Sequence, residues 1–381
     1  MKKLLIVHTN YQNKGGEDIA VEKEISFLKR NYEVKTLIFS NDIENIFNQI
    51  FSFLLNKNNK SMKKLNSLLD EFNPDIVYVH NTWFKASLGI FSILKKRNKK
   101  VIIKLHNFRY FCTKSYFLSK HLGNNEFCNA CGLSTKSTKL INKYYTDSLL
   151  KSFLLIRYGR RYFNILKNSD ITLLVLTEFH KKYLEENGFN KDRIHVLPNY
   201  IKISEDNKTK KEEDYIVYAG RVSKEKGVGE LIEAFLKVSH KSLQLKIIGI
   251  GPDFDRLKRK YSEASIFFLG EKTNKETLEI IKNSKAVVTA TKLFEGQPTL
   301  LCEASSLSVP AIFPETGGIA EFFPENYDFS FKQFNYLDLE KKISNLSKSN
   351  LSKIGQLNRE YLQDYLNEKT LDLKFEEVIN D

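Results

Sequence analysis

Two glutamates, Glu295 and Glu303, lie eight positions apart near Pro298 and follow an apolar, β-branched run at 286–290. Proline is favoured in the first turn of a helix, so the segment predicts a strand, a loop and then a helix that begins near residue 298. Glu295 would then lie in the loop, and Glu303 would project from the second helical turn. Both carboxylates can therefore face one ligand.

The first turn of this predicted helix is a second candidate binding feature. Its amides, from about Thr299 and Leu300 onward, would point into the same crevice with the positive end of the helix dipole. Such amides favour a phosphate, and carboxylates accept hydrogen bonds from hydroxyl groups. The segment therefore predicts a site for a polyhydroxyl anion.

Basic residues follow a different strand-like run, at 215–220. Arg221 and Lys226 come directly after it, and Gly227 ends the segment. Arginine offers a planar fork of donors and lysine a mobile point charge, so the two together can hold a diphosphate. The alternative is a solvated basic turn.

These segments together resemble the retaining glycosyltransferase family 4, whose members have the two-domain GT-B fold. The resemblance rests on the pattern Glu, seven residues, Glu, on Gly-Arg with a Lys five positions after the Arg, and on the segments 248–252 and 268–270 in the same order. It implies that Arg221, Lys226, Thr299 and Leu300 bind the donor diphosphate. It further implies that Glu303 binds the ribose and that Glu295 meets the donor sugar.

The first half of the chain contributes two more candidates. Gly15 and Gly16 follow the first apolar run and resemble the glycine-rich loop of the family, where the backbone can approach a phosphate or sugar closely. An ordinary turn is the alternative. His106 ends the run 101–105 and resembles the active-site histidine of the family, although a lone histidine is often structural.

Short β-rich runs alternate with longer helical patterns along the whole chain, which predicts an α/β protein with parallel sheets. The charged stretch 202–214 has no apolar periodicity and is typical of a linker. We expect a Rossmann-like acceptor-side domain at 1–200, a linker at 201–214, a Rossmann-like donor domain at 215–355, and a helical segment at 356–381 that crosses back to the first domain. The two sheets are expected to face across a cleft and to bind ligands beyond the carboxyl ends of their strands. The predicted strands are 4–8, 34–39, 76–80, 101–105, 171–176, 195–197, 215–220, 245–249, 266–269, 286–290 and 310–313.

The composition limits the classes of partner and location. A net charge of +14 on 381 residues attracts polyanions, but no nucleic-acid-binding motif accompanies it, so no nucleic-acid partner is expected. No apolar run is long enough to span a membrane, and the first residues predict a strand rather than a signal peptide. With four cysteines in addition, we expect a cytoplasmic protein with reduced thiols.

Two groups of residues could bind a metal. Cys112, His121, Cys128 and Cys131 contain a Cys-x-x-Cys pair and could hold a structural zinc, or they are reduced thiols in an insertion. Asp253 and Asp255 have the Asp-x-Asp spacing, but their place at a predicted helix start favours capping. Catalysis is therefore expected to need no metal or other cofactor.

The segment 151–167 predicts a helix with an apolar face and a face that carries Arg157, Arg160 and Arg161. Such a helix can pack on its own domain with the basic face in water, or lie on the anionic inner face of the plasma membrane. The two uses are compatible.

The resemblance implies a retaining transfer from a UDP- or GDP-hexose to the hydroxyl of a glycan or lipid-linked glycan, in bacterial cell-surface polysaccharide synthesis. A non-catalytic protein of the same fold that binds a polyanion or a membrane is the alternative. A Rossmann-type oxidoreductase is disfavoured, because neither half has Gly-x-Gly-x-x-Gly after its first strand.

Overall fold

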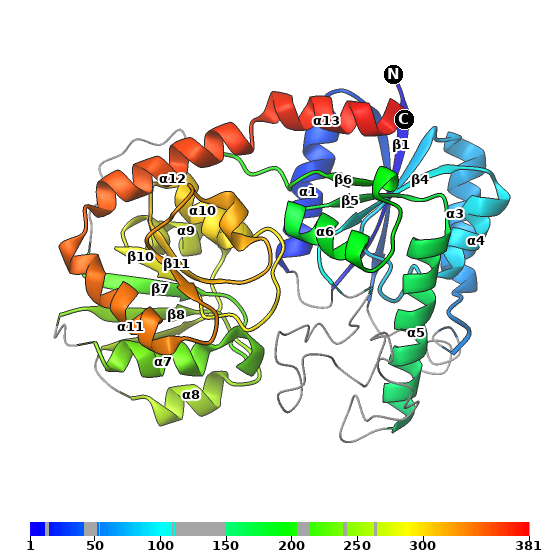
Figure 1. The fold of residues 1–381 in the computed structure, drawn as a ribbon. Helices are drawn as coiled ribbons and strands as arrows, with labels where there is room; N and C mark the ends of the chain where they lie inside the picture. The colour runs from blue at the N-terminus through cyan, green and yellow to red at the C-terminus, as the bar shows by residue number, and fades with distance from the viewer. Residues whose placement is uncertain are drawn as a thin grey trace. The chain divides into compact units, whose positions relative to one another are not determined.

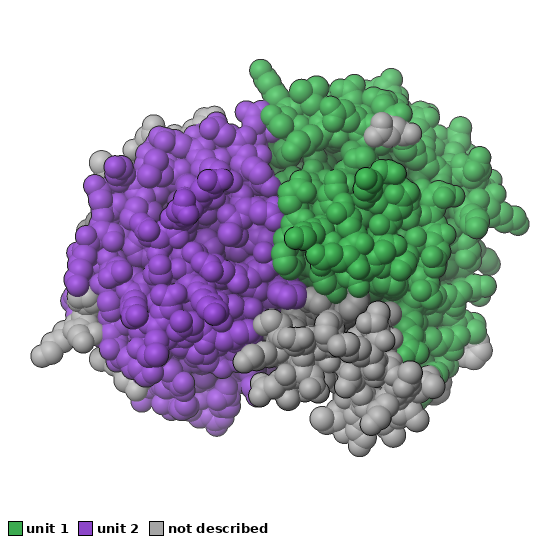
Figure 2. Space-filling view, viewed as in Figure 1, with its two compact units in different colours: residues 1–200, 369–381 green, residues 201–368 purple. Residues whose placement is uncertain are grey.

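The computed structural model describes residues 1–11, 15–41, 52, 54–108, 110, 149–203, 213–238, 242–262 and 265–380. The chain divides into two compact units, one of Met1–Tyr200 with Lys369–Asp381 and the other of Ile201–Glu368 (Figure 1). Figure 2 colours the first unit green and the second purple. Each unit contains a six-stranded sheet whose paired strands are all parallel, so the predicted α/β class is confirmed.

The first sheet has the strand order β2-β1-β3-β4-β5-β6. All four residues of β3 are buried, as expected for a strand covered on both faces of a parallel sheet. Its elements are β1 (Lys3–Asn10), α1 (Gly16–Leu28), β2 (Glu33–Ser40), α3 (Asn59–Phe72), β3 (Ile76–Val79), α4 (Gly89–Lys96), β4 (Lys100–Leu105), α5 (Leu149–Asn168), β5 (Thr172–Val175), α6 (Glu178–Glu186) and β6 (Ile194–Val196).

The second sheet has the strand order β12-β11-β10-β7-β8-β9. The three-residue strand β12 was not predicted, although Phe329 and Phe331 alternate with polar residues and are both buried, because the alternating run is only about five residues long. The elements are β7 (Tyr215–Ala219), α7 (Val228–Leu236), β8 (Gln244–Ile248), α8 (Phe254–Lys260), β9 (Ile266–Gly270), α9 (Asn274–Lys282), β10 (Ala286–Val288), α10 (Thr299–Ser306), β11 (Ala311–Glu315), β12 (Ser330–Lys332), α11 (Tyr336–Asn345) and α12 (Leu351–Tyr365).

The last helix, α13 (Glu368–Asn380), belongs to the first unit and lies near the end of α1 (Figure 1). Phe375 is 1% exposed and packs against Tyr32 and Tyr78. The preceding helix α12 stays with the second unit, where Leu362 enters the core beside α10. The return to the first unit therefore begins at α13, later than the expected residue 356.

A buried ion pair joins α1 to the middle of the first sheet. The Lys104 ammonium on β4 lies 3.0 Å from both carboxylate oxygens of Glu24, and these side chains are only 1% and 6% exposed. The Tyr78 hydroxyl donates a hydrogen bond to the same carboxylate at 2.7 Å. Burial lowers the pKa of Lys104 from its ordinary value, and Glu24 opposes that shift. Because every charge here has a partner, the pair fixes the position of α1 on the sheet.

We predict that Lys104→Met lowers the free energy of unfolding by about 3–5 kcal/mol, because the Glu24 carboxylate is left buried without its partner. Adding Glu24→Gln should recover a large part of this loss, since no uncompensated charge remains. Urea denaturation of the single and double variants tests this. Lys35→Met is the control, because the Lys35–Glu71 pair has side chains 40% and 64% exposed and should contribute about 1 kcal/mol or less. Additive losses in the double variant would contradict the coupling.

Candidate functional site

In the second unit, β7 and β10 are neighbours, so the residues that follow their carboxyl ends come together. The Lys226 ammonium lies 2.6 Å from Oε1 of Glu295, and the Thr291 hydroxyl donates to the same oxygen at 2.9 Å. The side chains of Lys226 and Glu295 are 30% and 27% exposed, so the pair is accessible from solvent. Two candidate residues from distant segments thus form one ion pair, which the sequence patterns did not predict.

Close backbone contacts hold the two loops that carry this pair. Gly227 has φ +68°, and a Cβ there would lie 2.0 Å from the carbonyl oxygen of Ala290. Gly317 has φ +59°, and a Cβ there would lie 2.1 Å from the carbonyl oxygen of Glu295. The amide of Gly318 donates to that Glu295 oxygen at 2.9 Å. Only glycine fits at these two positions without movement of the loops, so the backbone beside Lys226 and Glu295 is closely fixed.

Arg221 follows β7, and its side chain is exposed to solvent. Its carbonyl oxygen accepts a hydrogen bond of 2.8 Å from the hydroxyl of Tyr218. Burial, with the carboxylates of Glu295 and Glu225, raises the pKa of Tyr218, which keeps this hydroxyl protonated as a donor. The Tyr218 hydroxyl thus holds the backbone of the loop, and Arg221 itself is exposed.

The predicted helix after Glu295 is present as α10, with Pro298 at its N-cap position. The amide of Thr299 donates to the carbonyl of Gln297 at 3.0 Å. The next amides, beginning with Leu300, precede any helical carbonyl four residues back and are the first-turn donors that remain for a ligand. Glu303 projects from the second turn and is 6% exposed.

Asp253 occupies the N-cap position of α8, but its carboxylate makes no cap hydrogen bond there. It accepts instead from Arg256, with Oδ1 at 3.0 Å from Nε and 2.9 Å from Nη2. The expected capping role is therefore wrong for Asp253, because the guanidinium three residues later takes the carboxylate. Among the residues that the structure describes, no group of three or more His, Cys, Asp or Glu side chains could hold a metal ion.

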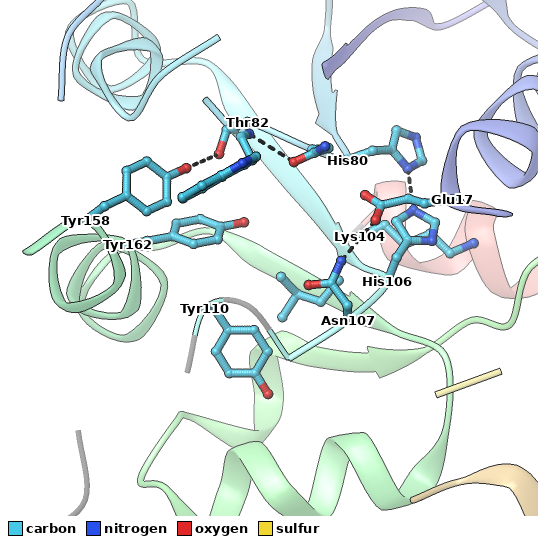
Figure 3. Close-up of a pocket in the computed structure, with 12 residues that line it drawn as sticks. Glu17, His80, Thr82, Lys104, His106, Asn107, Tyr110, Tyr158 and Tyr162 are labelled. Carbon is cyan, nitrogen blue, oxygen red and sulfur yellow. Dashed lines mark hydrogen bonds between the residues drawn. The ribbon is translucent and has the colours of Figure 1, made fainter. Parts of the chain in front are cut away.

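The first unit contains a hollow at the carboxyl ends of β3 and β4 (Figure 3). His106 follows β4 and lines this hollow, and its role as a site residue stays a prediction. Its Nε2 lies 2.9 Å from Nδ1 of His80, which follows β3. The hollow is lined by Glu17, His80, Asn81, Thr82, Trp83, Lys104, Leu105, His106, Asn107, Tyr110, Tyr158 and Tyr162.

The predicted glycine loop leads into α1 beside this hollow. Gly15 is the N-cap residue, and its amide donates to Oδ2 of Asp18 at 2.8 Å. The other oxygen of that carboxylate lies 2.9 Å from Nε2 of His8, and both side chains are at most 2% exposed. Burial acts to raise the pKa of Asp18, but the hydrogen bonds from His8 and Gly15 outweigh it and lower the pKa from its ordinary value.

Gly16 lies at the first position of α1, where a Cβ would meet no atom within 4 Å among the described residues. The adjacent Glu17 reaches the hollow, where its Oε2 accepts from Asn107 at 2.9 Å and from the Tyr11 hydroxyl at 2.8 Å.

The sequence patterns missed Glu17, His80 and Asn107 as site residues. His80 ends the predicted strand 76–80, and Asn107 comes two residues after the predicted strand 101–105. Polar residues just beyond the carboxyl ends of adjacent parallel strands are a usable signal for a site, and this signal was present in both cases.

Two other predicted features have different outcomes. Cys112, His121, Cys128 and Cys131 lie outside the described residues. The segment 151–167 lies in α5, which buries Leu155, Tyr158, Tyr162 and Leu166 and leaves Arg157 exposed. Searched over the described part of the chain, none of the helices is both long and apolar enough to cross a bilayer.

Two sequence families match the chain, Glycosyltransferase Family 4 over residues 42–205 and Glycosyl transferases group 1 over residues 199–363. The uncharacterized glycosyltransferase MJ1059 of Methanocaldococcus jannaschii is 25% identical over 274 residues, which cover 66% of this chain and 58% of that protein. The amylovoran biosynthesis glycosyltransferase AmsD of Erwinia amylovora is 25% identical over 151 residues, which cover 37% of this chain and 42% of AmsD. The chain thus spans about half the length of these two relatives.

Solved structures show the same fold over the whole chain. HepE of Anabaena, solved with UDP and glucose, has a TM-score of 0.71 at 14% identity, with 100% of both chains covered. The sucrose-phosphate synthase of Thermosynechococcus elongatus has a TM-score of 0.73 at 14% identity, with 100% of this chain and 98% of the synthase covered. Given the two family matches, the two parallel sheets and this fold, the chain belongs to the glycosyltransferases of the GT-B fold and is of the family 4 type.

Proposed function

We propose that the protein transfers a hexose from a UDP- or GDP-linked donor to an acceptor hydroxyl, with retention at the anomeric carbon and without a metal ion. The observation that carries this proposal is the Lys226–Glu295 pair, which joins the loop after β7 to the loop that precedes α10. A cation for phosphate and a carboxylate for sugar hydroxyls are thereby brought to one place. HepE, which shares the fold, was solved with UDP and with UDP-glucose.

In this proposal the second unit holds the donor. Arg221 and Lys226 bind the diphosphate together with the first-turn amides of α10 from Leu300 onward, whereas the predicted Thr299 amide already donates to the carbonyl of Gln297. Glu303, in the second turn, accepts hydrogen bonds from the ribose hydroxyls. Because the leaving group is a nucleoside diphosphate, the main chemical task is to stabilise negative charge as the glycosidic bond breaks.

Glu295 has two functions in this scheme. In the structure it neutralises Lys226 and holds its ammonium at 2.6 Å, so the cation is positioned before donor arrives. With donor bound, the ammonium turns toward the phosphate and the carboxylate accepts from hydroxyls of the donor sugar. The acceptor attacks from the side of the leaving group through an oxocarbenium-like state, and the departing phosphate takes the acceptor proton.

The first unit supplies most of the acceptor side. Gly15 and Gly16 of its glycine loop also contact the donor, and His106 is the catalytic histidine that meets the transferred sugar at the hollow beside α1. We propose a glycan or lipid-linked glycan acceptor in bacterial cell-surface polysaccharide synthesis, in a cytoplasmic protein. Two proteins similar to this chain are named for such pathways: AmsD for amylovoran biosynthesis and WaaB as a lipopolysaccharide outer core galactosyltransferase. WaaB has a TM-score of 0.65 at 16% identity over 99% of both chains.

Arg221→Ala and Lys226→Ala should each lower the affinity for UDP, because each removes a charge-assisted hydrogen bond to phosphate. A loss of about 2 kcal/mol, or roughly thirtyfold in Kd, is expected for Arg221→Ala. Lys226→Ala should lose more affinity for UDP than Arg221→Ala, since it also leaves the Glu295 carboxylate facing the phosphates. The double variant Lys226→Ala with Glu295→Ala should recover that additional loss.

Glu303→Ala should lower the affinity for UDP, whereas Glu295→Ala should leave the affinity for UDP unchanged and impair transfer. Calorimetry measures these affinities.

Lys237→Ala is the matched control for these variants, because Lys237 is 63% exposed and pairs with Glu340 in the same unit. Its affinity for UDP should equal that of the wild type. GDP is tested beside UDP to identify the base. Unchanged affinity for both nucleotides in Arg221→Ala and Lys226→Ala would contradict the donor assignment.

Transfer should continue in brief EDTA treatment, because protein cations and helix amides neutralise the diphosphate. The measurement is UDP release from UDP-glucose before and after chelation, with added Mg²⁺ or Mn²⁺ as the restoring arm. An immediate loss that either ion restores would show that a metal acts at the diphosphate.

We further propose that the basic side of α5 brings the protein to the anionic inner face of the plasma membrane. Each Lys or Arg near such a surface contributes about 1 kcal/mol at moderate salt. Replacing Arg157, Arg160 and Arg161 with Glu should therefore abolish sedimentation with phosphatidylglycerol vesicles and leave UDP affinity unchanged. Wild-type protein that stays in the supernatant at low salt would refute the membrane contact alone.

A further inference from the structure

Three of the seven histidines of the chain lie near the carboxyl ends of three adjacent strands of the first sheet. His8 is in β1, His80 follows β3 and His106 follows β4. His8 is held by Asp18, whereas His80 and His106 are held by each other. Figure 3 shows His80 and His106 side by side at the hollow.

The environment of His80 leaves its ring little freedom. The residue is 3% exposed, and its ring centroid lies 4.4 Å from that of Tyr78, whose hydroxyl is anchored on Glu24. The His8 ring meets it edge-on at 6.2 Å. The His106 ring meets it edge to edge, with the ring centroids 5.2 Å apart and Nδ1 of His80 2.9 Å from Nε2 of His106. His80 is therefore a fixed support for His106.

The hydrogen bond has a chemical consequence because a neutral imidazole has one N–H donor and one acceptor nitrogen. One ring of the pair must donate while the other accepts. Burial lowers the pKa of both histidines well below the ordinary value, and the nearby positive charge of Lys104 acts in the same direction. Both rings are thus neutral, and the N–H of one of them makes the hydrogen bond between them.

The bond also selects the nitrogen that His106 can offer to a ligand. Its Nε2 is occupied by His80, while its Nδ1 is a buried atom that has no hydrogen-bond partner among the described residues. When Nδ1 of His106 accepts from a hydroxyl, the hydrogen of that ring is on Nε2, which donates to Nδ1 of His80. When Nδ1 of His106 carries the hydrogen and donates, Nε2 of His106 instead accepts from Nδ1–H of His80. The ring that donates within the pair therefore decides whether Nδ1 of His106 accepts from a hydroxyl or donates to one.

We propose that His80 is a positioning residue for His106, the histidine that meets the sugar in the proposed function and whose Nδ1 is left for that contact. The inference rests on the proposed function, in which His106 lies at the transferred sugar. His80 itself does not touch the sugar. Its contribution is to fix the ring orientation and tautomer of His106.

Three replacements of His80 separate the hydrogen bond from packing. His80→Asn keeps a polar atom near the position of Nδ1, whereas His80→Leu fills the site without one. His80→Gln is polar but places its amide beyond that position. UDP release from UDP-glucose should have a kcat about tenfold lower in His80→Leu and His80→Gln, the effect of one lost hydrogen bond. His80→Asn should stay within about threefold of wild type.

The affinity for UDP should be unchanged in all three variants, because the nucleotide binds to the second unit. His195→Leu, a histidine replacement on β6, controls for the change of residue type and should keep the wild-type kcat. Wild-type kcat in a folded His80→Leu or His80→Gln variant would overturn the proposal.

A second measurement does not depend on turnover. With ¹⁵N-labelled histidine, the ring nitrogens of His106 should show one tautomer in wild type and in His80→Asn at pH 7. In His80→Leu and His80→Gln the two nitrogens should move toward averaged shifts as tautomers exchange. Identical His106 shifts in all proteins would refute the positioning role. If wild-type protein releases no UDP from UDP-glucose, that failure counts against the proposed function, and the nitrogen shifts still decide whether His80 positions His106.

Discussion

The buried Lys104–Glu24 pair is the interaction on which the candidate site of the first unit depends. Tyr78 pairs with Ile102 in the sheet, so His80 and Lys104, each two residues further along, lie opposite each other. Residues two apart on a strand share a face, which places Lys104 below His106 and Tyr78 below His80. Glu24 brings α1 onto this face, and the first turn of α1 carries Glu17 and the Asp18 carboxylate that holds Gly15. The histidines and the glycine loop are thus positioned from one buried charge.

In the second unit, close backbone contacts rather than a buried ion pair position the site residues. Its loops approach so closely that a Cβ at Gly249 would lie 2.1 Å from the carbonyl oxygen of Gly220, and one at Gly251 would lie 2.3 Å from that of Val222. Because these loops touch, one cannot move without the other. The backbones of the loops therefore help to set the distance between Lys226 and Glu295. The charged groups at this site remain partly exposed, which suits residues that must exchange partners when an anion binds.

Much of this arrangement could be read from the sequence, and the remainder has physical reasons. The long buried strands were found because parallel strands covered on both faces form apolar runs, and α10 was found from Pro298 and the carboxylates around it. The His80–His106 bond was missed because it depends on which strands are adjacent, and local patterns do not encode strand order. The separation of α12 from α13 was missed because both helices are amphipathic and only tertiary contacts distinguish their partners.

The position of α13 affects how the protein is made. Leu371, Phe375, Val378 and Ile379 complete the core around Leu4 and Tyr78, yet they are translated after the whole of the second unit. At about 5–20 residues per second, the ribosome needs on the order of ten seconds or more to pass from residue 201 to residue 368. During that interval the nascent first unit exposes the apolar surface that α13 will cover, while the second unit can close its own core. The unit that is synthesised first is therefore the one that completes its core last.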